Sequence, residues 1–245
     1  MNAFEIKNLQ KRFKDKLAVN SINLDIVEGE LFALLGVNGA GKTTTIKMLS
    51  GLSRPTGGDA LIFNKSILNN LENIKELIGV SPQETSVAPN LTVKENLEFM
   101  SEIYGFEKNK SIKKTADIIK EFSLDEVKND MVKTLSGGWQ RRLSIAMALI
   151  SEPKVLFLDE PTLGLDVLAR RELWNMIGNL KGKITIILTT HYLEEAEALS
   201  DRIAIMVKGD IKALGTAKEL KELTKTTSIE EAFIKIAEGG NIDEK

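Results

Sequence analysis

The stretch "LFALLGVNGAGKTTTIKML", residues 31–49, constrains the fold of this chain more than any other. A continuous apolar run leads into a glycine-rich loop and then into a helical pattern. Apolar runs without alternation are typical of strands that are buried on both faces of a parallel sheet. Glycines let backbone N–H groups curl around an anion, and the start of the following helix adds a favourable dipole. The stretch therefore predicts a strand, a phosphate-binding turn and a helix in direct succession.

The loop fits the pattern G-x-x-x-x-G-K-[ST] in its expected context, after a strand and before a helix. Lys42 can then reach the β- and γ-phosphates of a nucleotide, and the Thr43 hydroxyl can ligate Mg²⁺. An ordinary strand–turn–helix connection is the alternative explanation. The predicted nucleotide-binding residues of the loop are Gly36, Asn38, Gly39, Ala40, Gly41, Lys42, Thr43 and Thr44.

Two further apolar runs, at 154–160 and 184–191, also lead into helical patterns. Repeated strand–helix units predict an α/β fold with a parallel sheet. The stretch "SINLDIVEG" alternates apolar and polar residues instead, which favours a half-exposed antiparallel strand near the N-terminus. "IMVKGDIKALG" predicts a hairpin around Gly209 and Asp210.

Strand patterns are absent between about residues 89 and 150, which predicts a helical segment. Thr92 and Glu95 have the spacing of a capping box, as have two later pairs, Thr216 with Glu219 and Ser228 with Glu231. We therefore expect one domain over residues 1–245. Its parts are an α/β core with an antiparallel portion (1–88 and 151–215), a helical subdomain (89–150) and a short C-terminal helical extension (216–245).

The composition excludes several classes of protein. The chain has no cysteine and one histidine, which excludes disulfides and thiolate metal sites and argues against zinc. A formal net charge of −2 without a basic stripe gives no reason to expect nucleic-acid binding. No segment has the apolar length of a signal peptide core or a membrane span. We expect a cytoplasmic chain that is at most peripheral to a membrane.

Two acidic residues, Asp159 and Glu160, end the second apolar run. Open α/β sheets bind their ligands at the carboxyl ends of strands, and a buried carboxylate there favours a nearby cation. Beside a phosphate loop that cation would be Mg²⁺, which leaves Glu160 to polarise an attacking water as a general base. The simpler alternative is a solvated loop start. His191 ends the third run, where a structural role is the alternative, and Gln83 in "VSPQET" carries no signal by itself.

A second glycine-rich turn, "LSGGWQRR", precedes a helical pattern near residue 137. Ser136 is a suitable N-cap, and exposed amides after it would make a second anion site. A plain turn between two helices is the alternative. The order of the motifs along the chain distinguishes these two interpretations. "GVNGAGKTT", Gln83, "LSGGWQRR", "VLFLDEP", "GLD" and His191 together resemble the nucleotide-binding subunits of ABC (ATP-binding cassette) transporters, over about residues 4–215.

The resemblance implies a P-loop NTPase (RecA-like) core and two cassettes that pair head to tail. Each ATP then lies between the P-loop of one subunit and the LSGG helix of the other. It implies that Ser136, Gly137 and Gly138 bind the partner's γ-phosphate. It further implies that Gln83 reaches Mg²⁺ and the attacking water and senses the membrane part of the transporter, and that Asp159 holds Mg²⁺ through water. The remaining implied roles are adenine stacking by Phe13, general base catalysis by Glu160, a γ-phosphate contact by His191 and a dimer contact by Asp166.

The sequence departs from the family pattern at three places. Phe13 replaces the more usual tyrosine, so stacking survives but a hydroxyl is lost. Trp139 replaces the commonest glutamine, so any polar contact of that amide is lost. Its ring packs against the facing subunit, or it is a simple surface or core tryptophan. "TLGLD" replaces the more frequent "TSALD", and with the tail "SIEEAFIKI" it is similar to cassettes of drug, sodium and lipid efflux.

The resemblance implies an ATPase that binds ATP and Mg²⁺, pairs with a second ABC subunit as a homodimer, and energises a separate integral membrane permease. The expected process is export, and the expected location is the cytoplasmic face of the cell membrane. A soluble cassette that acts on a macromolecular assembly is the main alternative. A third is a nucleotide-binding regulator without hydrolysis, which the presence of Glu160 and His191 opposes.

Overall fold

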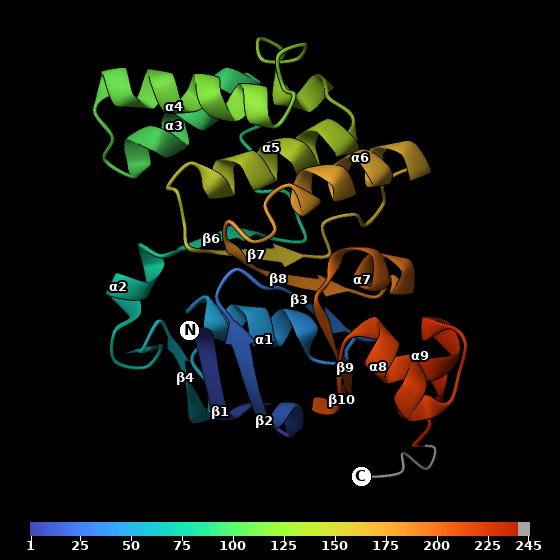
Figure 1. The fold of residues 1–245 in the computed structure, drawn as a ribbon. Coiled ribbons are helices and arrows are strands. Elements are labelled where there is room, and N and C mark those ends of the chain that lie inside the picture. Colours follow the sequence, from blue (N-terminus) through green and yellow to red (C-terminus); the bar gives the residue numbers. More distant parts are fainter. Residues whose placement is uncertain (240–245) are drawn as a thin grey trace. The chain divides into compact units, whose positions relative to one another are not determined.

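The structure is a computed structural model that describes residues 1–239, so residues 240–245 of the expected C-terminal extension lie outside the described residues. Within it the chain divides into two compact units. Unit 1 comprises Met1–Lys75 and the described chain from Lys181 onward, and unit 2 comprises Glu76–Leu180. Figure 1 labels the elements of both. Unit 2 includes the expected helical segment together with flanking residues on both sides of it.

Unit 1 contains an antiparallel sheet in the order β2-β1-β4-β5. Along β2 the side chains of Ile22, Leu24 and Ile26 are buried while those between them are exposed, as the alternating pattern predicts. The bounds are β1 Asn2–Phe13, β2 Lys16–Val27, β4 Gly57–Ile62 and β5 Lys65–Ser66.

Unit 1 also contains the strands β3, β8, β9 and β10, in which β3 pairs in parallel with both β8 and β9. The strand β10 pairs antiparallel with β9 in the predicted hairpin. Leu35 lies opposite Thr190, so the chain leaves β3 and β8 at the same edge, at Gly36 and His191. The bounds are β3 Leu31–Leu35, β8 Thr185–Thr190, β9 Arg202–Val207 and β10 Asp210–Gly215.

The helices of unit 1 pack on these strands through apolar side chains. One core cluster joins Ala33, Ile203 and Ile205 of the strands to Leu220 and Ile236 of the last two helices. The bounds are α1 Lys42–Leu49, α2 Leu71–Lys75, α7 Leu193–Leu199, α8 Ala217–Thr224 and α9 Ile229–Ala237.

The predicted caps of α8 and α9 form differently. Thr216 and Glu219 make the complete capping box at α8. At α9 the Ser228 hydroxyl accepts from the Glu231 amide, but the Glu231 carboxylate accepts from the amide of Thr227. The carboxylate of the second pair therefore bonds to the residue before the N-cap instead of to the N-cap itself.

Unit 2 has a parallel strand pair and a group of helices (Figure 1). Ser81 of β6 lies opposite Leu158 of β7, so Gln83 and Glu160 follow strands that end at the same edge. Thr92 and Glu95 form the predicted capping box of α3. The bounds are β6 Ile78–Ser81, α3 Val93–Ile103, α4 Lys108–Glu121, the 3₁₀ helix Val132–Thr134, α5 Gly137–Leu149, β7 Val155–Asp159 and α6 Val167–Gly178.

Helix α5 is the central helix of unit 2. All its residues from Arg141 to Leu149 are buried, including both arginines at positions 141 and 142. Buried charged groups require partners. Arg141 bonds to the carbonyl of Pro82, and Arg142 pairs with Glu172. None of the helices among residues 1–239 has the length and apolarity needed to cross a bilayer.

Candidate functional site

The phosphate loop in unit 1 has the backbone that its glycines predict. Gly39 and Gly41 have φ values of +81° and +115°, which side chains with a Cβ rarely adopt. A Cβ at Gly41 would lie 2.6 Å from the carbonyl oxygen of Ala18, whereas one at Gly39 would meet nothing within 4 Å. The loop is therefore tightly supported on its inner side and open at Gly39.

The start of α1 is suited to an anion. The helix has neither a side-chain cap nor an acidic residue in its first turn. The buried Lys42 lies in that turn and donates from Nζ to the carbonyl oxygen of Gly36 at 2.7 Å. The helix dipole and the ammonium group thus act at the same loop, as phosphate binding requires.

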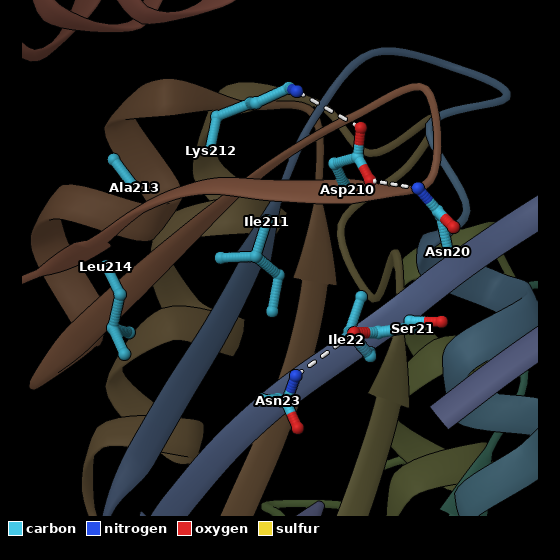
Figure 2. A pocket seen from close by; sticks show the side chains of 9 residues that line it. All are labelled: Asn20, Ser21, Ile22, Asn23, Asp210, Ile211, Lys212, Ala213 and Leu214. Atoms are coloured by element: carbon cyan, nitrogen blue, oxygen red, sulfur yellow. Dashed lines mark hydrogen bonds and ion pairs between the residues drawn. The ribbon is translucent and has the colours of Figure 1, made fainter. Parts of the chain in front are cut away.

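The turn of the β9–β10 hairpin is bonded to the phosphate loop. The amide of Gly209 donates to the carbonyl of Ala40 at 2.8 Å, and the amide of Asn20 donates to the carbonyl of Gly209 at 2.9 Å. Figure 2 shows the Asp210 carboxylate between Asn20 and Lys212, which donate to it at 2.9 and 3.1 Å. The turn of the β9–β10 hairpin, itself bonded to β2, therefore supports the phosphate loop at Ala40.

A groove of unit 1 runs between β2 and β10 beside this hairpin (Figure 2). Its lining includes Ile22, Asn23, Ile211 and Leu214. None of the predicted nucleotide-binding residues lines it. This groove is therefore distinct from the predicted nucleotide site.

His191 lies at the same strand edge as the phosphate loop, because the amide of Gly36 donates to the carbonyl of Thr190 at 3.3 Å. The imidazole is half-buried and its ring centre lies 4.1 Å from that of Tyr192. Unit 1 thus brings together the phosphate loop and the histidine that the sequence singles out.

Phe13 ends β1, also in unit 1, and half of its side chain is exposed. The Lys11 ammonium lies 5.0 Å from the centre of the ring, and it also donates to the carbonyl of Arg54 at 2.5 Å. A cation–π contact at an exposed site is worth about 0.5–1 kcal/mol, so it favours this orientation of the ring. Phe13 is therefore a positioned aromatic surface.

Unit 2 holds the acidic residues. Asp159 and Glu160 end β7 with only 4% and 6% of their surface exposed. Glu160 has a φ of +48°, in the left-handed region that costs a residue with a Cβ about 1–2 kcal/mol. Such strain at a buried carboxylate is typical of a functional position.

Gln83 is exposed in the loop after β6. Its carbonyl and that of Pro82 accept hydrogen bonds from the guanidinium group of Arg141, which is in α5. Arg141 is the residue that sequence reasoning overlooks, because "QRR" in a helix gives no sign of a contact some sixty positions earlier. Unit 2 thus brings the Gln83 loop and α5 into direct contact.

The start of α5 corrects one expectation. Ser136 is the N-cap residue by backbone conformation, but its hydroxyl makes no capping hydrogen bond. The first turn contains no acidic residue either. A Cβ at Gly137 would meet nothing within 4 Å, whereas one at Gly138 would lie 3.3 Å from the Cβ of Ala169. A side chain at position 138 would thus press against α6, whereas one at position 137 would meet open space.

Trp139 packs within its own chain. The guanidinium carbon of Arg142 lies 4.5 Å from the centre of the indole ring, and Arg142 also forms an ion pair with Glu172 of α6. Gln140, the residue after Trp139, donates to the carbonyls of Val132 and Leu135. The side chains that follow the two glycines therefore fasten the helix start in place.

Asp166 caps α6. One carboxylate oxygen accepts from the amides of Leu168 and Ala169 at 2.9 and 3.0 Å, although the residue itself is exposed. The structure thus provides an intramolecular role for this aspartate. Its predicted contact across a dimer interface stays a prediction.

Replacing Asp166 by alanine is expected to lower the free energy of unfolding by about 1 kcal/mol, because both amides lose their acceptor. Asp166→Asn retains a capping oxygen and is expected to stay within a few tenths of a kcal/mol of the parent chain. Urea denaturation followed by circular dichroism measures both. Equal stability of Asp166→Ala and the parent would contradict the capping role.

Unit 1 has a phosphate loop between β3 and α1, and unit 2 has buried carboxylates at the carboxyl end of β7. Both features are typical of P-loop ATPases. Comparison with known families makes the assignment specific. The family model described as "ABC transporter" matches residues 19–163, and the chain belongs to that family. It is an ATP-binding cassette, and such cassettes are ATPases by class.

Similar proteins agree with this assignment. Human phospholipid-transporting ATPase ABCA3 is 42% identical over 222 residues, which cover 89% of this chain and 13% of that protein. The daunorubicin/doxorubicin resistance ATP-binding protein DrrA of Streptomyces peucetius is 40% identical over 220 residues, covering 89% of this chain and 67% of DrrA. The chain thus spans a small part of ABCA3 and two thirds of DrrA.

The fold is also that of solved cassettes. The dimeric, post-hydrolysis structure of the ATP-binding cassette MJ0796 with ADP and Pi matches with a TM-score of 0.78 at 27% identity, covering 87% of this chain and 98% of that one. The predicted fold class, α/β with an antiparallel portion and a helical insert, is confirmed.

Proposed function

We propose that this chain is the ATP-hydrolysing subunit of an exporter, working as a homodimer on a separate membrane permease at the cytoplasmic face. The names of DrrA and ABCA3, a resistance protein and a lipid transporter, support the export direction. The observation that carries the proposal is the start of α5. A serine and a glycine there stay uncapped and open, although the side chains after them hold the helix firmly.

The nucleotide would bind to unit 1. The adenine stacks on the free face of Phe13, because Lys11 holds the ring by cation–π attraction. The residues from Gly36 to Thr44 hold the phosphates through backbone amides, with Lys42 supplying the positive charge. His191 lies at the same strand edge as the loop and contacts the γ-phosphate.

The predicted metal ligands fit Mg²⁺. Thr43, Gln83 and Asp159 offer hydroxyl, amide and carboxylate oxygens, which are the donors that this hard cation prefers. Bound Mg²⁺ would neutralise the charge that develops on the phosphates. In this proposal Asp159 holds the ion through water, and Gln83 orients the attacking water.

Glu160 would accept the proton of that water. Its side chain is buried, and the left-handed backbone at the end of β7 fixes where the carboxylate begins. A base held in this way is ready for proton transfer without rearrangement. The chain thus contributes a base, a water-orienting amide and a phosphate cradle.

The second subunit would complete each site. In the proposed head-to-tail dimer, the Ser136 hydroxyl and the amides of Gly137 and Gly138 bind the γ-phosphate of the partner's ATP. Asp166 lies in the loop before α6, whose Ala169 packs beside Gly138, so its neighbourhood would face the same interface. Binding of two ATP closes the dimer, and hydrolysis with phosphate release reopens it.

Affinity purification of the tagged chain from membranes in mild detergent tests the permease partner. We expect a polytopic membrane protein in stoichiometric amount, retained after a high-salt wash and absent when the untagged chain is used. Recovery of ribosomes or another soluble assembly in its place would reject the permease and favour the soluble cassette.

A further inference from the structure

Three consecutive side chains of α5, those of Gln140, Arg141 and Arg142, are bound to different parts of unit 2. Gln140 reaches back to the 3₁₀ segment before the helix, and Arg142 reaches Glu172 of α6. These two contacts hold α5 against the 3₁₀ segment and against α6. Arg141 instead reaches the loop after β6, which carries the predicted site residue Gln83.

The contact of Arg141 is well defined. Its two terminal guanidinium nitrogens donate to two successive carbonyls, Nη1 to Pro82 at 2.6 Å and Nη2 to Gln83. Because the guanidinium is planar and its nitrogens have fixed spacing, a two-point bond of this kind restricts both peptide units at once. The loop that presents the Gln83 side chain is thus tied to the helix that begins at Gly137.

Electrostatics strengthens the tie. Arg141 is 5% exposed, and burial lowers the pKa of its guanidinium, while the negative charge of Asp159 acts in the opposite sense. Arginine nevertheless stays charged in proteins. The buried cation therefore bonds to the loop after β6 and interacts electrostatically with Asp159, which ends the paired strand β7.

We propose that Arg141 is a positioning residue, which holds the Gln83 side chain in its working place through the backbone of its loop and ties that place to the start of α5. The proposal rests on the function proposed above. Arg141 would thereby link α5 to the Gln83 loop. When α5 shifts on engaging the partner's nucleotide, the Gln83 loop moves with the helix. In this proposal Arg141 acts through the backbone carbonyls of Pro82 and Gln83.

A lysine at position 141 tests the link, because it retains the charge but offers a point donor that cannot bond both carbonyls in the same way. We expect Arg141→Lys to lower kcat about tenfold, while the Kd for ATP and the KM change less than about twofold. The measurements are steady-state ATPase rates of the full chain and equilibrium binding of a fluorescent ATP analogue.

A double-mutant cycle with Gln83→Ala separates positioning from a general loss of structure. The alanine retains the carbonyl to which Arg141 donates and removes only the side chain that it positions. We therefore expect Arg141→Lys to lower kcat less than about twofold in the Gln83→Ala background. An equal tenfold loss in both backgrounds would overturn the proposal.

Arg142→Lys is the matched control, since it changes a buried arginine on the same helix whose partner is Glu172. We expect its effects on kcat to be the same with and without Gln83. If the parent chain has no ATPase activity at all, the proposed function fails. If the parent is active and the cycle is additive, only the role of Arg141 fails.

Discussion

Glu160→Gln is expected to reduce ATP turnover by roughly a hundred- to ten-thousandfold, because the amide cannot accept the proton of the attacking water. The substitution preserves the size of the side chain and leaves the φ of +48° to a residue of similar backbone preference. The phosphate loop lies in the other unit and is unchanged, so the Kd for ATP should stay within about twofold of the parent value. Turnover is measured by phosphate release.

The same variant should accumulate as an ATP-bound dimer, visible as a doubled mass in light scattering. Glu152→Gln is the matched control, because Glu152 also has a left-handed backbone, with φ of +55°, but its side chain is largely exposed and paired with Lys114. That variant should hydrolyse ATP at the parent rate. A normal rate in Glu160→Gln would show that Glu160 is not the base.

Local features of the fold and of the phosphate loop follow directly from the sequence. The glycines of the phosphate loop, the apolar strands and the caps at Thr92 and Thr216 are set by residues close together in the chain. Backbone preference, hydrophobic pattern and hydrogen bonding act over a few positions there, so the sequence specifies the outcome. The left-handed conformation of Glu160 has no such local signal.

Contacts between distant segments are what the sequence leaves open. Ser136 looks like an ordinary cap, yet its hydroxyl makes no capping bond. The indole of Trp139 lies against the guanidinium of Arg142, and a contact of its ring with a facing subunit stays a prediction. Arg141 acquires its partners from the end of β6. The contact of Arg141 depends on which element packs beside α5, and no pattern within the helix encodes that.

Gly137→Asp should have opposite effects on folding and on function. The added side chain meets open space, and a carboxylate in the first turn interacts favourably with the helix dipole. The free energy of unfolding should therefore stay unchanged or rise by up to about 1 kcal/mol. The same negative charge would face the γ-phosphate of the partner's ATP, and juxtaposed like charges cost several kcal/mol. ATPase activity and dimer formation should fall at least about a hundredfold.

ATP binding to the isolated chain distinguishes this explanation from simple damage. It should remain within about twofold of the parent in Gly137→Asp, because the helix start would serve a nucleotide held by another subunit. Gly137→Asn is the matched control of nearly equal size without charge, and it should lose much less activity. Loss of ATP binding by the single chain would mean that the helix start serves the chain's own nucleotide, which the head-to-tail dimer forbids. Gly138 is unsuitable for this test, since its packing against Ala169 would mix folding with function.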